Sequence, residues 1–533
     1  MLRQQIERGL PPLTPRAAPA ERPAPVPAMK PLAGDLTVHE FRFAGNTLIA
    51  TELLRSAVAG WLERPLNFSQ LQEAAAAVGT VYRDAGWVVR AYLPQQEIVN
   101  GIVTIQIVEA LFGGVFIEAE KLERISLDRL KAVVDRAQTA GQPLNAEALD
   151  RALLLLSDLP GVNVAGSLRE GARQGESDVV LKAADKLMLS GEASLDNTGS
   201  RSTGKERLTT NLVLNSPFAI ADQGNFNILH TEGSDYVRLA YSVPLGFNGW
   251  RVGINASEMR YRLIGADFAA LNGFGDSGTQ GLDLSYPIYR SRLANLYLNS
   301  TFDKKTFDNS SGGATTTRYE LQVLTLAMNG NLTDNLGGGG TSSASLTLTS
   351  GSVNLDGSPN QAADEASTRS AGKFTKLRYS ASRQQTLTES LGLSGNLSGQ
   401  LANKNLDSGE KFYLGGSGGI RAYPASEGGG AEGLMVNLEL RWRLSDGFNL
   451  TGMYDWGSVK VNRNNDFVGG AALNRIILRG GGLVFGWQGE RGENLKLVWA
   501  RRIGSNPNPT PAGNDQDGTL VRNRFWLTAG LSF

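Results

Sequence analysis

The chain has 533 residues, 41% of them hydrophobic, and its 52 Lys and Arg residues balance 52 Asp and Glu residues. This length allows several domains, and the zero net charge excludes a global field that would attract nucleic acid or an acidic substrate. Cysteine is absent, which excludes disulfides, thiolate zinc sites and cysteine nucleophiles.

Residues 1–34 are predicted to form a short helix and a linker. Leu2–Arg8 can make two helical turns, and the prolines from Pro11 to Pro31 then favour an extended tether. Residues 1–8 contain no apolar signal core, so we expect an exported form to carry a leader that is absent from this sequence.

Residues 35–110 are predicted to form a domain with the order β-α-α-β-β. An extended segment and a helix come first, and the second helix starts at Ser69 and ends at Gly86. Two strands then follow, joined by a turn at Asn100 and Gly101. The predicted extended segment, first helix and two strands are Leu36–Phe43, Glu52–Trp61, Trp87–Leu93 and Ile102–Val108.

Residues 111–185 repeat this order. Ser126 and Asn145 are predicted to begin the two helices, because their side chains can accept hydrogen bonds from the first unpaired amides. The predicted elements are Val115–Glu118, Ser126–Ala137, Asn145–Leu156, Val162–Leu168 and Asp178–Ala183. The alternative is two unrelated α+β domains.

Residues 186–533 are predicted to form a barrel of sixteen antiparallel strands. Helical periodicity stops, and short alternating segments follow one another, separated by turns rich in Gly, Asn, Asp and Ser. An even number of strands lets the barrel close with both ends on one side. The expected strands begin near Leu187, Arg207, Gly224, Tyr236, Trp250, Thr279, Ala294, Arg318, Ser343, Phe374, Ser390, Leu434, Phe448, Ile476, Leu495 and Phe525.

The alternation indicates an apolar outer face and a wet interior. In the last strand Phe525, Leu527, Leu531 and Phe533 share one side, and the segment from Leu434 alternates hydrocarbon with charge in the same way. A soluble two-sheet core does not fit this pattern. No apolar run approaches the length of a membrane helix, about 18 residues, whereas a membrane barrel needs only about 9–11 alternating residues per crossing.

The whole pattern resembles the two-partner secretion transporters, the TpsB family, in which two POTRA domains precede a sixteen-stranded barrel. Four local matches support the resemblance. Tyr92–Gln96 with Gly101 is similar to the end of the first POTRA domain, and Phe533 to a terminal barrel-assembly signal. Residues 415–423 (GGSGGIRAY) are similar to the tip of the sixth external loop, expected at about 408–433. Residues 453–457 (MYDWG) are similar to the Phe-x-Asp-x-Gly pattern of the thirteenth strand.

The resemblance implies which residues anchor the loop. Arg421 would pair with Asp455 inside the barrel, with Tyr423, Gly419 and Gly457 completing the two motifs. Two positions depart from the family pattern: Ala422 replaces glycine and Met453 replaces phenylalanine. Because alanine resists positive φ, the loop tip is where the backbone of this chain could differ.

The resemblance also implies where a partner binds. An exposed sheet edge of each POTRA domain would capture an extended segment by strand addition. The residues expected at these edges are Val162, Val164 and Leu168 in the second domain and Val88 and Tyr92 in the first, and Leu531 and Phe533 form the expected barrel signal.

By this resemblance, the protein would secrete one dedicated exoprotein, unfolded and without ATP, across the outer membrane of a Gram-negative bacterium, with its POTRA domains in the periplasm. Its partners would be that large exoprotein, outer-membrane lipid and, during biogenesis, the barrel-assembly machinery, and we expect a monomer that binds no nucleic acid. The passenger could be an adhesin, a cytolysin, a contact-dependent toxin or a metal- or haem-acquisition protein. The alternatives are a barrel-assembly insertase, a passive porin and an outer-membrane enzyme.

No enzyme activity, cofactor or metal is predicted. His39 and His230 fall in different domains, which argues against a histidine metal site or a catalytic pair. The run Gly337–Gly340 is not followed by a predicted helix, and no G-x-x-x-x-G-K-[ST] sequence is present, so no phosphate-binding loop is expected.

Overall fold

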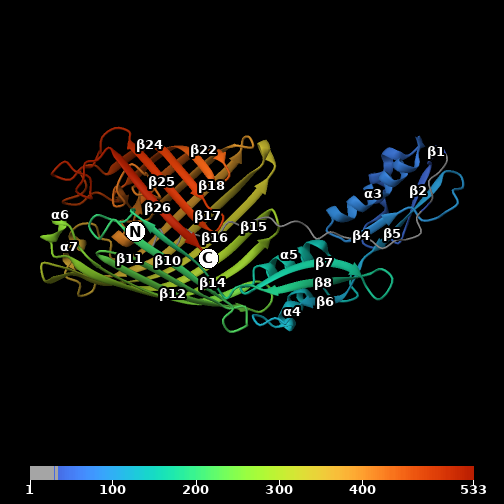
Figure 1. Cartoon of the computed structure of the whole chain (residues 1–533), viewed down its shortest axis with the longest axis horizontal. Coiled ribbons are helices and arrows are strands. Elements are labelled where there is room, and N and C mark those ends of the chain that lie inside the picture. Colours follow the sequence, from blue (N-terminus) through green and yellow to red (C-terminus); the bar gives the residue numbers. More distant parts are fainter. Residues whose placement is uncertain (1–28, 30–33, 120) are drawn as a thin grey trace.

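The protein consists of a large β-barrel with two small α+β domains at one end, as seen in a computed structural model (Figure 1). The structure describes residues 29, 34–119 and 121–533. The second small domain lies next to the barrel and the first lies farther away. The predicted helix at Leu2–Arg8 lies outside the described residues. In the described part of the chain, no helix is long and apolar enough to cross a membrane.

The first domain has the predicted β-α-α-β-β order around a mixed three-stranded sheet, β2-β5-β4. Helix α3 begins with a capping box, in which the side chain of Asn67 accepts from Gln70 N at 3.0 Å and that of Gln70 from Asn67 N at 2.9 Å. Asn100 and Gly101 form the predicted turn, with φ of 54° and 67°. The elements are β1 (Leu36–Thr37), β2 (Glu40–Ala44), α2 (Thr51–Val58), the 3-10 helix η1 (Ala59–Trp61), β3 (Pro65–Leu66), α3 (Phe68–Asp84), β4 (Val89–Tyr92) and β5 (Ile102–Glu109).

The second domain repeats this architecture with sheet order β6-β8-β7. Both predicted helix caps are confirmed: the Ser126 side chain accepts from Arg129 N at 3.3 Å and the Asn145 side chain from Ala148 N at 2.8 Å. The first strand begins earlier than predicted, at Leu111. The elements are β6 (Leu111–Ala119), α4 (Leu127–Ala137), α5 (Ala146–Ser157), β7 (Val162–Glu170) and β8 (Glu176–Asp185).

The remaining chain forms a closed barrel of sixteen antiparallel strands, as predicted, with the last strand β26 paired to the first strand β9. The largest difference from the expected starts is at β14, which begins at Phe274 rather than Thr279. The strands are β9 (Leu189–Asp196), β10 (Arg207–Asn215), β11 (Gln223–Thr231), β12 (Ser234–Leu245), β13 (Trp250–Arg262), β14 (Phe274–Arg290), β15 (Ala294–Ser311), β16 (Ala314–Asp334), β17 (Gly340–Asn354), β18 (Gly372–Thr386), β19 (Leu391–Ala402), β22 (Glu432–Ser445), β23 (Phe448–Lys460), β24 (Arg475–Gln488), β25 (Glu493–Arg502) and β26 (Asn523–Ser532).

Short helices lie in the loops at the far end of the barrel and in one turn at the near end. They are α6 (Ala266–Ala269), α7 (Gln361–Ala366) and the 3-10 helix η2 (Leu336–Gly338).

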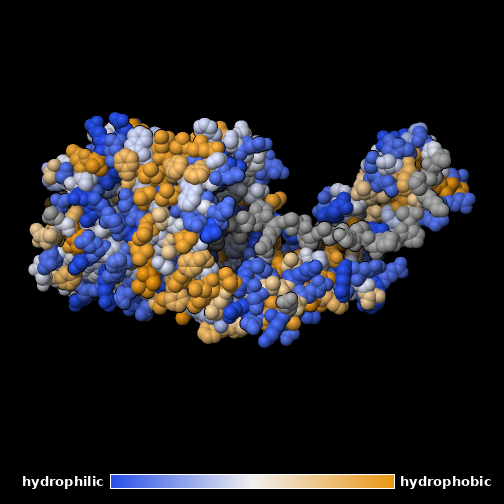
Figure 2. All heavy atoms as spheres, viewed as in Figure 1, coloured by the Kyte–Doolittle hydropathy of each residue, from blue (hydrophilic) through white to orange (hydrophobic). Residues whose placement is uncertain are grey.

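The two faces of the barrel wall differ as the alternation predicts. On β12, Val237 and Leu239 are 43% and 47% exposed on the outside, while Arg238 between them lines a cavity inside the barrel. Figure 2 shows the outward apolar side chains as a band on the visible face of the barrel, with hydrophilic residues over the end that carries the long loops. The wall therefore has a hydrocarbon exterior, and polar and charged side chains are among those that line the cavity inside it.

The second domain is fastened to the short turns at the near end of the barrel. The Arg290 guanidinium donates to both carboxylate oxygens of Asp158, each at 2.8 Å. Arg151 of α5 donates to the carbonyl of Pro287 at 2.7 Å. These contacts hold helix α5 and its C-terminal cap Asp158 against the end of strand β14.

Candidate functional site

The loop between β19 and β22, residues 403–431, folds back into the barrel. We call it loop 6. It contains the 3-10 helix η3 (Ser408–Glu410) and a small sheet of β20 (Phe412–Tyr413) and β21 (Gly429–Gly430). Its apolar side chains Leu414, Ile420 and Ala422 are fully buried and pack with inward residues of strands β22 to β26. The loop therefore fills one side of the lumen.

Arg421 at the loop tip meets Asp455 on β23. Its side-chain Nε and Nη2 donate to the two carboxylate oxygens at 2.9 and 2.7 Å, and its backbone N–H donates to Oδ2 at 3.0 Å. Asp455 is 0% exposed and Arg421 is 5% exposed. This is the planar, two-pronged geometry that a guanidinium makes best with a carboxylate.

Three more side chains hold the same pair. Arg421 Nη1 donates to Glu439 at 2.5 Å, and Asn437 Nδ2 donates to Asp455 Oδ1 at 2.8 Å and to the carbonyl of Gly419 at 3.1 Å. The Trp526 indole donates to the carbonyl of Arg421 at 2.8 Å. None of the three was predicted as a site residue.

The sequence does contain a signal for them. Asn437 and Glu439 fall on the inward positions of β22, and Trp526 is a large aromatic residue on the side of β26 that otherwise carries Thr528 and Gly530. A bulky side chain at an inward position indicates that something fills the lumen there.

The motif glycines serve close packing. A Cβ at Gly457 would lie 2.6 Å from Leu414 Cδ2, and one at Gly419 would lie 2.0 Å from the carbonyl oxygen of Leu414. Ala422 does not have positive φ, so alanine is tolerated there. Its methyl group fits because strand β24 has Gly480 opposite, where a Cβ would approach that of Ala422 to 2.7 Å.

Tyr423 links the loop tip to the last external loop, residues 503–522. Its ring is buried under the guanidinium of Arg502, 4.4 Å from the ring centre, and Arg502 pairs with the fully buried Asp515 of that loop. The tip is thus held both by the wall and by a neighbouring loop.

Strand β7 is an open edge of the second domain's sheet. Gly161 O accepts from Lys186 N at 2.9 Å and Gly171 N donates to Glu176 O at 2.8 Å, so odd-numbered residues of β7 bond β8. Even-numbered residues direct their N–H and C=O groups to the open side. These include the predicted residues Val162, Val164 and Leu168. The side chains of Val162 and Val164 are buried in the core, so only their backbone is available.

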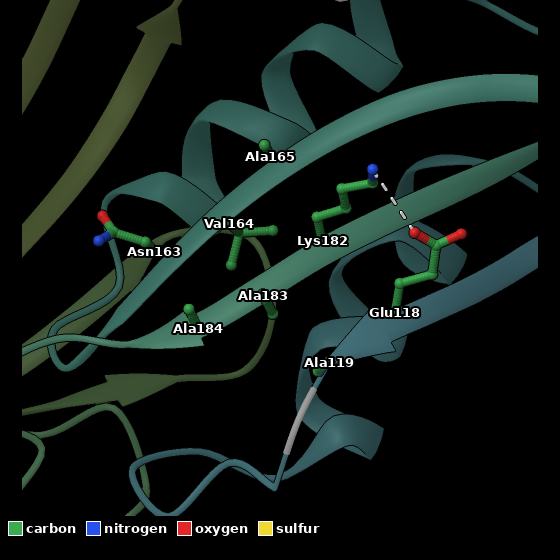
Figure 3. A pocket seen from close by; sticks show the side chains of 8 residues that line it. All are labelled: Glu118, Ala119, Asn163, Val164, Ala165, Lys182, Ala183 and Ala184. Carbon is green, nitrogen blue, oxygen red and sulfur yellow. Dashed lines mark ion pairs between the residues drawn. The ribbon is translucent and has the colours of Figure 1, made fainter.

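A groove runs across the outer face of this sheet beside β7 (Figure 3). Small side chains, among them Ala165 and Ala184, form its floor. Lys182 and Glu118 pair across it at 3.7 Å, and both are largely exposed.

The edge of the first domain is less free than predicted. Tyr92 lies on edge strand β4, but Leu93 O at its end already accepts from Met29 N at 3.0 Å. Val88 lies outside β4, and its N–H donates to Leu144 O of the second domain at 3.1 Å. The junction between the two domains therefore uses Val88, which corrects its expected place on a partner-binding edge.

The chain's last residues lie at the seam of the barrel. Phe533 N and O bond the backbone of Gly191 at 2.9 and 2.8 Å, and the side chains of Leu531 and Phe533 are 44% and 55% exposed on the outside. The terminal aromatic residue is thus part of the closure between β26 and β9.

Comparisons with known proteins agree with this architecture. A heme/hemopexin transporter protein, HuxB of Haemophilus influenzae, is 25% identical over 500 residues, covering 92% of this chain and 85% of the relative. An outer membrane transporter, CdiB of Dickeya dadantii, is 26% identical over 435 residues, covering 79% and 75%.

Solved structures share the fold. CdiB from Escherichia coli superposes with a TM-score of 0.72 at 19% identity, covering 100% of this chain and 95% of that one. BamA from Haemophilus ducreyi lacking POTRA domains 1–3 gives 0.57 at 14% identity, covering 93% and 100%.

Two protein families match along the chain. The ShlB-type POTRA domain matches residues 36–110, and the haemolysin secretion/activation protein family ShlB/FhaC/HecB matches residues 175–475. The second match spans more than half of the chain. The chain therefore belongs to the ShlB/FhaC/HecB family and is an outer-membrane transporter of two-partner secretion, with its POTRA domains in the periplasm.

Proposed function

We propose that this transporter recognises one dedicated exoprotein through its POTRA domains and passes it, unfolded and without ATP, through the barrel to the cell surface. The observation that carries the proposal is the open edge of β7, which lies on the domain fastened to the barrel mouth. An extended segment added there would be delivered next to the lumen.

Backbone pairing supplies affinity that does not depend on sequence, and the groove beside β7 supplies selection. A segment added to β7 would place alternate side chains beside Ala165 and the other small residues of the groove, with Lys182 of β8 two strands away (Figure 3). The expected passenger segment is therefore extended, with bulky side chains alternating along it.

The lumen beside loop 6 supports passage of an unfolded chain. A cavity of about 1190 Å³ remains there, and much of its wall carries hydroxyl and amide groups. Such groups can exchange hydrogen bonds with a moving backbone. Representative lining residues are Thr325, Asn329, Asn331, Ser343, Ser345 and Thr347.

Free energy for export would come from the passenger itself. The periplasm supplies no nucleotide, and the chain has no phosphate-binding loop motif. Folding of the passenger outside the cell would make backward movement unfavourable. The same reasoning makes a monomer sufficient, because one barrel encloses one lumen.

Deletion of the protein tests the proposed function. We expect one large polypeptide to remain in the periplasm while other barrels assemble normally. A general loss of outer-membrane barrels would indicate an insertase, and a loss of small-solute uptake alone would indicate a porin.

A proline at the open edge tests recognition. Val164→Pro removes an outward N–H donor, so we expect weaker binding of the passenger to the full transporter in detergent. Val164→Ala is the matched control, because it also reduces packing in the core but keeps the donor. Equal affinity of the two variants would exclude strand addition at β7.

A further inference from the structure

Residues 407–410 form what we call the neck of loop 6. The neck is held to a part of the barrel wall away from the Arg421 site. Glu410, at the end of η3, is 4% exposed and lies between Lys305 of β15, at 2.7 Å, and Lys376 of β18, at 2.5 Å. Strand β15 stands six strands from β23 in the barrel order. The loop therefore crosses the lumen between two separate attachments.

Further hydrogen bonds reinforce this neck. Gln400 of β19 is fully buried, and its Nε2 donates to Glu410 O at 3.2 Å and to Ala431 O at 2.9 Å, which joins Glu410 to the last residue of loop 6. Lys376 Nζ also donates to Glu410 O at 2.9 Å, and Tyr319 donates to Asp407 at 3.0 Å.

The Glu410 carboxylate and the two lysine side chains stabilise one another. Burial alone raises the pKa of the Glu410 carboxyl, but the charges and hydrogen bonds of Lys305 and Lys376 outweigh burial and hold that pKa below its ordinary value. Removing the carboxylate would leave two lysine side chains, 14% and 4% exposed, without their counter-ion.

The same three side chains border the open part of the lumen. Glu410, Lys305 and Lys376 all line the cavity beside loop 6. A change at any of them alters both the attachment of the loop and the charge that an ion or a passing chain meets.

We propose that Glu410 is a second anchor of loop 6, independent of the Arg421–Asp455 pair, and that it sets the charge of the lumen at the neck. Either anchor alone keeps the loop in the barrel, so the loop leaves its seat only when both are broken. Glu410 is a positioning residue, since it acts on the passenger's path by holding the loop and offsetting one of the two lysine charges.

Loop release is tested by labelling. Because the chain has no cysteine, Ser417→Cys at the half-buried tip reports accessibility to a soluble maleimide without background. We expect Arg421→Ala and Glu410→Gln each to change the labelling rate little. The double variant should label at least about tenfold faster than either single variant, a factor that corresponds to about 1.4 kcal/mol.

Ion selectivity tests the charge role in planar bilayers. We expect the reversal potential to shift toward anion selectivity in Glu410→Gln and toward cation selectivity in Lys305→Gln, which removes one of the two positive charges beside the carboxylate. Glu320→Gln is the matched control, because Glu320 of β16 pairs with Lys304 of β15, next to Lys305, but does not line the cavity.

Two results would overturn the proposal. One is a double variant that labels no faster than Arg421→Ala, and the other is a reversal potential that does not move in opposite directions in Glu410→Gln and Lys305→Gln. If Glu410→Gln fails to fold, Lys305→Gln carries the test by itself. The Lys305→Gln variant keeps the ion pair between Lys376 and Glu410. An unchanged reversal potential in this variant would contradict the proposal.

Discussion

At the scale of single residues, the buried carboxylate of Asp455 decides how the loop tip sits. It has no contact with solvent. It accepts hydrogen bonds from the side chain and the backbone N–H of Arg421 and from the side chain of Asn437. A carboxylate removed from water in this way is tolerated only because all these donors face it.

Neutralising that carboxylate should destabilise the protein. We expect Asp455→Asn to lower the free energy of unfolding by roughly 3–5 kcal/mol, as breaking a buried ion pair does, and to reduce secretion. Denaturant unfolding in detergent and a secretion assay measure the two effects. Glu258→Gln, in an exposed pair with Arg260, should change neither.

Exchanging the two charges should restore function only in part. In Arg421→Asp with Asp455→Arg, the new carboxylate on the loop can meet the new guanidinium, but the backbone N–H of residue 421 loses its acceptor. Secretion is expected to lie between that of the single variants and the wild type. Wild-type secretion by both single variants and by the exchange would contradict the pairing.

At the scale of elements, Glu109 ties the end of β5 to the start of the helical layer in the first POTRA domain. Its carboxylate accepts from Thr47 N, Leu48 N and the Tyr82 hydroxyl at 2.7, 2.8 and 2.7 Å. Burial acts to raise the pKa of Glu109, but hydrogen bonds from Thr47, Leu48 and Tyr82 outweigh it and lower that pKa.

This shift predicts the pH dependence of the domain. A depressed pKa contributes stability that is fully present above the ordinary glutamate value, about 4.3, and is lost as the pH falls through the folded-state pKa. We expect Glu109→Gln to weaken this dependence, as measured by thermal unfolding of the helical circular dichroism signal between neutral and acid pH. An equally steep loss of stability in the variant would assign the effect to another group.

At the scale of the whole molecule, ion pairs fix the second POTRA domain against the barrel. The Arg290 side chain is 7% exposed and holds Asp158 with two bonds, and Arg292 pairs with Asp150 at 2.5 Å. The orientation of the β7 edge relative to the lumen depends on these pairs.

Asp158→Asn should free this domain to move. We expect the distance between spin labels at Arg136→Cys on α4 and Thr388→Cys in a barrel turn to broaden, because one of the two charged pairs is lost. Asp135→Asn is the control, since Asp135 pairs with Lys131 on the same helix. An unchanged distance distribution in Asp158→Asn would mean that packing alone holds the domain.

How much the sequence could predict depends on how local the signal is. Helix starts at Ser126 and Asn145 and the turn at Asn100 depend on neighbours within a few residues, and all three are as predicted. Strand ends are less local, because a strand continues as long as its neighbour pairs with it, so β14 begins five residues earlier than its alternation indicated.

The sequence by itself determined the number of strands, their lipid and lumen faces and the repeated small domain, because a period of two or of 3.6 residues records which side meets water. Only the tertiary structure decided which inward side chains meet. Glu410 reaches Lys305 across 105 positions, and Trp526 reaches Arg421 across another 105. Such contacts follow from how strands tilt and how loop 6 folds back, and these are properties of the closed barrel that no short segment encodes.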